Sequence, residues 1–90
     1  MKGNQIRKLR ETLGLSATEF SSLVGVQTSS IYRWEKAGNK TAIVEGFARK
    51  IFQLIGELKV KEREVMVKQL RRGGWMAGVH SLLTMSMKKA

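Results

Sequence analysis

Apolar residues recur mostly at intervals of three and four positions along this chain, and proline is absent. Such spacing places side chains on one face of an α-helix, whereas a half-buried strand would require strict alternation. The pattern therefore predicts an all-α fold. The expected helices cover approximately residues 5–13, 16–24, 27–36, 41–55, 61–72 and 75–87.

Glycine and small polar residues indicate where these helices begin and end. Ser16 and Glu19 have the spacing of a capping box, in which each side chain bonds the backbone N–H of the other residue. Gly25 follows the second apolar stripe, at a position suited to a positive φ angle. We expect Asn4 and Thr41 to cap the first and fourth helices.

The apolar face of each expected helix predicts the core of the protein. A Gly-Gly pair at residues 73–74 separates the last two helices, so the final apolar stretch can fold back or cross over. The residues expected to face inward are Ile6, Leu9, Leu13, Phe20, Leu23, Val24, Ile31, Trp34, Ile43, Phe47, either Ile51 or Phe52, Leu54, Ile55, Val65, Met66, Gln69 and Leu70.

The composition argues against an enzyme. The 90 residues suffice for one small domain and include no Cys, no Asp and a single His, His80. A Ser-His-Asp triad and a thiolate site cannot be assembled from this set, so we predict no catalytic residues, no metal and no cofactor. No apolar run approaches the ~20 residues of a membrane span, and the first residues lack the apolar stretch of a signal peptide. We therefore expect a cytoplasmic protein with no membrane partner.

The charge balance indicates a polyanionic partner. Seventeen Lys and Arg stand against seven acidic residues, which gives a net charge of +10. A basic globular chain favours nucleic acid because neutralising phosphates releases counterions. The alternative is a basic face that serves solubility alone.

Two short helices on either side of Val24-Gly25-Val26 have the arrangement of a helix-turn-helix. Ile31 and Trp34 would anchor the second of these helices from below. Its outer face then carries Thr28, Ser29, Tyr32 and Arg33, whose side chains can reach base edges. An arginine such as Arg33 can hold guanine O6 and N7 together, whereas the alternative role is a phosphate contact.

Residues 6–38 resemble the Cro/repressor helix-turn-helix family, also called lambda-repressor-like. The resemblance lies in Ile6-Arg7-Lys8-Leu9-Arg10, Gly14-Leu15-Ser16, Glu19-Phe20, Leu23-Val24-Gly25-Val26 and Ile31-Tyr32-Arg33-Trp34-Glu35-Lys36. It implies a five-helix bundle that binds operator DNA as a dimer and represses transcription.

The resemblance also assigns roles to individual residues. Ala17 stands where many members have a Gln that touches phosphate, so that contact is either lost or supplied by Thr18. Arg10 and Glu35 match a structural pair of the family. The base-reading positions fall on Gln27, Thr28, Ser29, Tyr32 and Arg33, and the phosphate contacts on Thr18, Lys36, Asn39 and Lys40.

The predicted architecture has two parts. Residues 1–58 would form the DNA-binding bundle, and residues 59–90 a helical extension that makes a homodimer. The centre of that interface is expected at Trp75, Val79, Leu82 and Leu83, an apolar stripe that a 58-residue bundle has little area to cover.

Three functions compete on this evidence. The leading one is a small dimeric repressor that binds double-stranded DNA. The second is an antitoxin that represses its operon and binds a toxin through the C-terminal segment. The third is a co-regulator that uses the bundle for protein contacts. A homodimer through residues 61–87 would disfavour the antitoxin, and the absence of specific DNA binding would favour the co-regulator.

Overall fold

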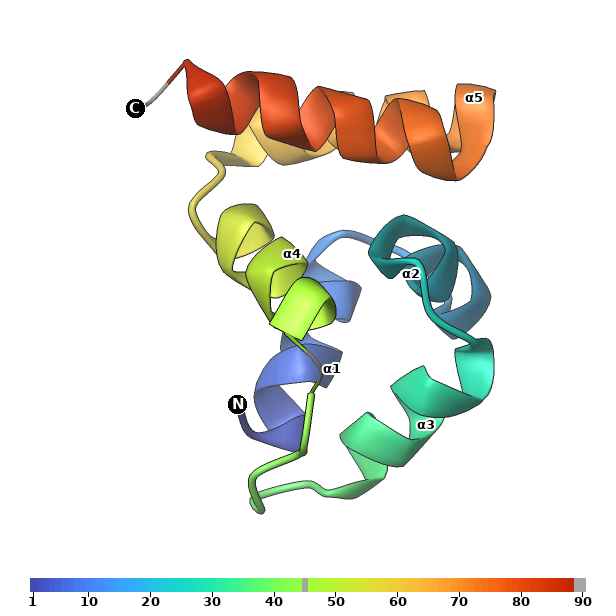
Figure 1. Cartoon of the computed structure of the whole chain (residues 1–90), viewed down its shortest axis with the longest axis vertical. Coiled ribbons are helices and arrows are strands. Elements are labelled where there is room, and N and C mark those ends of the chain that lie inside the picture. Colours follow the sequence, from blue (N-terminus) through green and yellow to red (C-terminus); the bar gives the residue numbers. More distant parts are fainter. Residues whose placement is uncertain (45, 89–90) are drawn as a thin grey trace.

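The computed structural model describes residues 1–44 and 46–88 and contains five helices (Figure 1). They are α1 (Gly3–Thr12), α2 (Ala17–Val24), α3 (Thr28–Lys36), α4 (Gly46–Gly56) and α5 (Val60–Met87). Within these described ranges there is no strand, only an isolated bridge between Lys2 and Thr41. The predicted all-α architecture is confirmed, and the two helices expected at residues 61–72 and 75–87 together form α5. Residue 45 of the predicted fourth helix and residues 89–90 of the predicted extension lie outside the described part.

Local signals set the boundaries of α2 as predicted. Ser16 Oγ accepts from the Glu19 N–H at 3.1 Å, and Glu19 Oε1 accepts from the Ser16 N–H at 3.1 Å. These bonds satisfy two backbone donors that no helical carbonyl can reach. At the other end, Gly25 adopts φ +80° and turns the chain toward α3. The helix-turn-helix geometry therefore follows from residues close together in the sequence.

The start of α4 differs from the prediction. Thr41 does not cap a helix, because residues 41–44 run extended beside the N-terminus, where the Ala42 N–H donates to the Met1 carbonyl at 2.8 Å. In this segment Ala42 and Val44 are buried, while Ile43 is 91 % exposed. Phe47, at the beginning of α4, is also exposed, so neither Ile43 nor Phe47 belongs to the core. Likewise, Lys2 and not Asn4 is the N-cap of α1.

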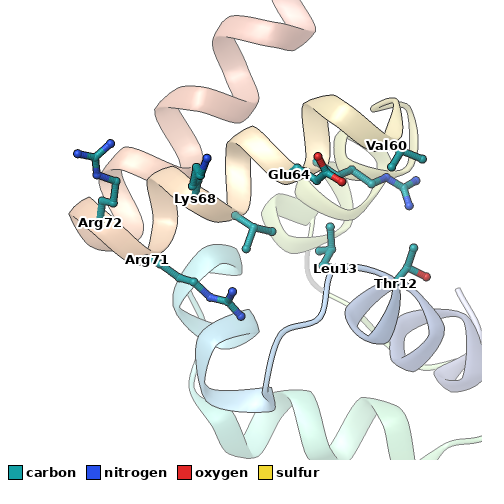
Figure 2. A pocket seen from close by; sticks show the side chains of 9 residues that line it. Thr12, Leu13, Val60, Glu64, Lys68, Arg71 and Arg72 are labelled. Atoms are coloured by element: carbon teal, nitrogen blue, oxygen red, sulfur yellow. The ribbon is translucent and has the colours of Figure 1, made fainter.

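A sharp reversal at Gly74 divides α5 into two arms. Gly74 has φ +76° and ψ −160°, values that no helical residue adopts and that glycine tolerates. The first arm, residues 60–73, passes over Leu13 at the end of α1 (Figure 2), and the second arm, residues 75–87, returns beside it (Figure 1). Gly78 permits the close approach, since a Cβ there would lie 3.0 Å from Leu70 Cβ. The Gly73-Gly74 break thus produces a helical hairpin.

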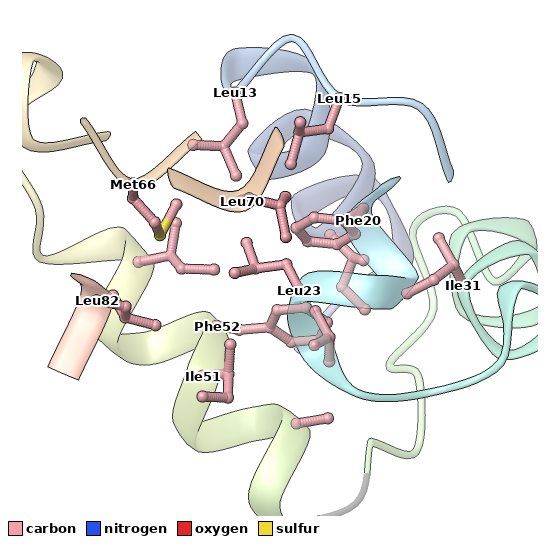
Figure 3. Packing of buried hydrophobic residues seen from close by; sticks show 14 of the residues in the cluster. Leu13, Leu15, Phe20, Leu23, Ile31, Ile51, Phe52, Met66, Leu70 and Leu82 are labelled. Atoms are coloured by element: carbon pink, nitrogen blue, oxygen red, sulfur yellow. The ribbon is translucent and has the colours of Figure 1, made fainter. Parts of the chain in front are cut away.

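One apolar cluster joins all five helices (Figure 3). Phe20 of α2 stacks on Phe52 of α4 with ring centroids 5.4 Å apart, and Trp34 of α3 meets Phe52 edge-on at 5.9 Å. The first arm of α5 adds Met66, Val67 and Leu70, and the second arm adds Val79 and Leu82. The α5 hairpin is therefore part of the same core as the helix-turn-helix.

The packing of α5 corrects four sequence predictions. Val79 and Leu82 are buried inside the chain, so they do not lie in an exposed stripe that awaits a second copy. On the first arm, Val65 and Gln69 face solvent where we expected them to face inward. The reason is that the hairpin packs on α2 through positions 66, 67 and 70, which rotates residues 65 and 69 outward. Trp75 and Leu83 remain exposed, as expected.

Candidate nucleic-acid interface

The recognition helix α3 has one buried face and one open face. Ile31 is completely buried, and Trp34 is nearly so, in the core below the helix. On the outer face, the side chains of Gln27, Ser29, Tyr32 and Arg33 are exposed. Thr28 differs, because it is half-buried and its hydroxyl lies 3.0 Å from the Ser21 hydroxyl of α2. Four of the five predicted base-reading residues are therefore accessible, and the fifth joins α2 to α3.

Arg10 of α1 and Glu35 of α3 form a two-pronged ion pair. Arg10 Nε donates to Glu35 Oε2 at 2.7 Å and a terminal nitrogen donates to Oε1 at 2.9 Å, while the other terminal nitrogen donates to the Leu15 carbonyl at 3.1 Å. Only 17 % of the Arg10 side chain and 10 % of the Glu35 side chain are exposed. The hydrogen bonds to Glu35 raise the pKa of Arg10, in spite of the opposing effect of burial. This pair fixes the angle between α1 and α3.

The C-terminal end of α3 is held against the beginning of α1. The Asn4 N–H donates to the Gly38 carbonyl at 2.9 Å. A Cβ atom on Gly3 would collide with the Trp34 carbonyl oxygen and would lie 2.7 Å from the Gly38 nitrogen, so only glycine permits this approach. No helical periodicity in the sequence indicates such a contact.

The predicted phosphate-binding residues are exposed beside the recognition helix. Lys36 lies in its last turn, and Asn39 and Lys40 follow in the loop. Asn39 Oδ1 accepts from the Asn4 side chain at 2.6 Å, which leaves its NH₂ group for a further acceptor. Thr18, in the first turn of α2, is also exposed. Backbone N–H groups and the helix dipole favour an anion at such a position.

A protein-family model described as Helix-turn-helix matches residues 6–57, which is more than half of the chain. The chain belongs to the Cro/C1-type helix-turn-helix family. Comparison with curated proteins and with solved structures gives no match. The match covers α1 to α4 and ends before α5.

Membership in the helix-turn-helix family establishes the general role of the protein. It is a DNA-binding transcription regulator, and the family is a regulatory one without catalytic function. In the part of the chain that the structure describes, no three His, Cys, Asp or Glu side chains gather as metal ligands. The same ranges contain no helix that is long and apolar enough to cross a membrane.

Outside the matched region, two residues of α5, Arg71 and Trp75, contact the helix-turn-helix in ways that the sequence did not predict. Arg71 donates to Glu19 Oε2 at 3.1 Å and to the Gly14 carbonyl at 3.1 Å. The bonds from the Ser16 N–H and from Arg71 lower the pKa of Glu19 below its ordinary value. Trp75 lies over the turn, where its Nε1 would be 3.2 Å from a Cβ on Gly25. These residues are about fifty positions apart in the sequence, so no local spacing indicates the contacts.

Proposed function

We propose that this helix-turn-helix protein is a sequence-specific repressor that binds operator DNA as a homodimer, with α3 in the major groove. The observation that carries the proposal is the division of α3 into a buried anchor and an open polar face that includes Arg33. A helix held in this way presents side chains to base edges with little freedom to reorient. Repression of transcription in the cytoplasm then follows from occupancy of the operator.

The exposed residues of α3 divide into two roles. We assign base reading to Gln27, Ser29, Tyr32 and Arg33. Of these, Arg33 can donate two hydrogen bonds to guanine, one to O6 and one to N7. Thr28 shares its hydroxyl with Ser21, so its contribution is to position the start of α3. Phosphate binding belongs to Thr18, Lys36, Asn39 and Lys40, which place the protein on the duplex without reading sequence.

Replacement of Arg33 should separate base reading from phosphate binding. The operator would first be selected as the bound sequence from a random DNA pool. We expect Arg33→Ala to weaken binding to this operator by about 1–3 kcal/mol and to relax the preference at one base pair. The matched control is Lys40→Ala, which should weaken binding to all duplexes alike and reduce the slope of log K against log salt by about one unit. Fluorescence anisotropy on selected and scrambled duplexes at several salt concentrations measures both effects. Identical behaviour of the two variants would show that Arg33 contacts only phosphate.

The homodimer would form through the outward face of the α5 hairpin. Exposed large apolar side chains on this helix are 42–76 % accessible, which is unusual for so small a protein. Besides Val60 at the start of the helix, they are Val65, Trp75, Met76, Leu83 and Met87. A second copy on this surface would remove them from water and bring two recognition helices to half-sites about 34 Å apart on the operator.

A charge on this surface should separate the two copies without unfolding either one. We expect Leu83→Glu to shift the full chain from dimer to monomer in sedimentation velocity at about 10 μM, because an interface core excludes unpaired charge. Phe47→Glu is the matched control, since Phe47 is also exposed (60 %, against 44 % for Leu83) but lies on α4, and it should leave the dimer unchanged. A monomeric parent protein would contradict the homodimer and favour the antitoxin function. Equal dissociation by both variants would place the interface elsewhere.

A further inference from the structure

A hollow of about 420 Å³ lies between the end of α1 and the first arm of α5 (Figure 2). Its apolar lining comes from Leu13, Val60 and Val67, which belong to both elements. A volume of this size lies within the range of small-molecule sites in proteins. It is remote from the open face of α3, and its α5 side lies beyond the region matched to the family.

The rim of this hollow is strongly basic. Arg63, Lys68, Arg71 and Arg72 surround it, and Glu64 is the one acidic residue in the lining. Figure 2 shows Lys68, Arg71 and Arg72 along one side of the opening. Within residues 1–44 and 46–88, no carboxylate pairs with Lys68 or Arg72. The rim therefore carries cationic charge that the protein itself does not neutralise.

Two of the arginines are already ordered. The Nε–H of Arg63 is buried and has no acceptor among the described residues, although its terminal nitrogen donates to the Gly56 carbonyl at 3.3 Å. Arg71 is held by Glu19 and by the Gly14 carbonyl. Arg63 and Arg71 therefore keep positive charge at the rim in fixed positions, and ligand binding need not order them.

We propose that this hollow binds an amphipathic organic anion, such as an alkyl carboxylate. The apolar lining would take the hydrocarbon part, and Lys68 and Arg72 would take the anionic group. DNA fits the site less well, since a phosphate backbone would use the cations but would not use the apolar lining from Leu13, Val60 and Val67. Binding at this place does not depend on the proposed repressor function. Arg71 lines this hollow and also donates to Glu19, so it would connect the bound ligand with the capping box of α2.

Titration of the full chain with decanoate tests the chemical class of the ligand. We expect saturable binding of one decanoate per chain in isothermal titration calorimetry. Decanol, which has the same tail without charge, and acetate, which has the charge without the tail, should each bind at least about tenfold more weakly, because each loses more than 1.4 kcal/mol of interaction. Absence of saturable decanoate binding, or equal affinity for decanol, would overturn the proposal.

Charge reversal on the rim tests the location. Lys68→Glu should weaken decanoate binding about tenfold by removing a charged hydrogen bond. Lys61→Glu is the control, because Lys61 is exposed on the same arm, outside the lining, and makes the same change in net charge. Circular dichroism of both variants should match the parent chain. Equal weakening by both variants would show non-specific attraction and overturn the site. The site would also be overturned if Lys68→Glu lost duplex DNA binding while its decanoate affinity stayed unchanged. That result would show that Lys68 contacts DNA phosphate.

Discussion

A chain that ends at Lys59 will not hold the helix-turn-helix in its folded form. The α5 hairpin places Met66, Val67, Leu70, Val79 and Leu82 in the common core, and its removal would expose Leu23, which lies against Gly78, to water. Burial of one large apolar side chain contributes about 1.5–3 kcal/mol. Five such side chains therefore contribute about as much as the entire 5–15 kcal/mol by which a typical domain is stable. Far-UV circular dichroism should show most helical signal lost, with no cooperative urea transition.

Two neighbouring leucines in the full chain provide the matched comparison. Leu82→Ala should cost about 2–5 kcal/mol, because Leu82 is completely buried and its truncation leaves a cavity. Leu83→Ala should cost less than about 1 kcal/mol in the monomer, since Leu83 is already 44 % exposed. Urea melts in dilute solution measure both. A truncated chain that unfolds cooperatively with the stability of the parent would contradict the common core and show residues 1–58 to be an independent domain.

Replacement of Glu35 by alanine should be the most damaging change at a charged position. The Arg10 side chain is only 17 % exposed, and its guanidinium would lose its carboxylate partner while remaining largely buried. Stranding a buried charge in this way costs about 3–5 kcal/mol. The control is Glu11→Ala, which breaks the pair between Arg7 and Glu11, whose side chains are 64 % and 59 % exposed. An exposed pair of this kind contributes at most about 1 kcal/mol.

The double variant distinguishes an interaction from two independent losses. Arg10→Ala with Glu35→Ala should cost less than the sum of the single variants, since removal of both partners leaves no uncompensated charge. Chemical unfolding of the four proteins gives the coupling energy. Additive losses would show that the two side chains do not stabilise each other. Because the pair fixes α3 on α1, operator affinity should fall in parallel with stability.

The helix-turn-helix could be predicted from the sequence because its determinants are local. The capping box at Ser16 and Glu19 and the positive φ of Gly25 depend on residues at most a few positions apart, and both were confirmed. The open face of α3 follows from the helical period once Ile31 and Trp34 are known to be buried. The resemblance to the family supplied the pairing of Arg10 with Glu35, which no period indicates.

The remaining features depend on partners far away in the chain. Residues 41–44 run extended because the N-terminus lies beside them, although Thr41 is a good capping residue on its own. Arg71 and Trp75 contact Glu19 and Gly25 only because α5 packs on α2.

The sequence by itself therefore determined the helical class, the recognition motif and the basic character of this protein. The tertiary structure alone decided which face of α5 is buried. Leu82 and Leu83 are equally apolar neighbours, and their different exposure follows from how the hairpin packs against α2. Hydrophobic burial has no direction of its own, so an apolar pattern predicts that a face will be covered but not which element will cover it.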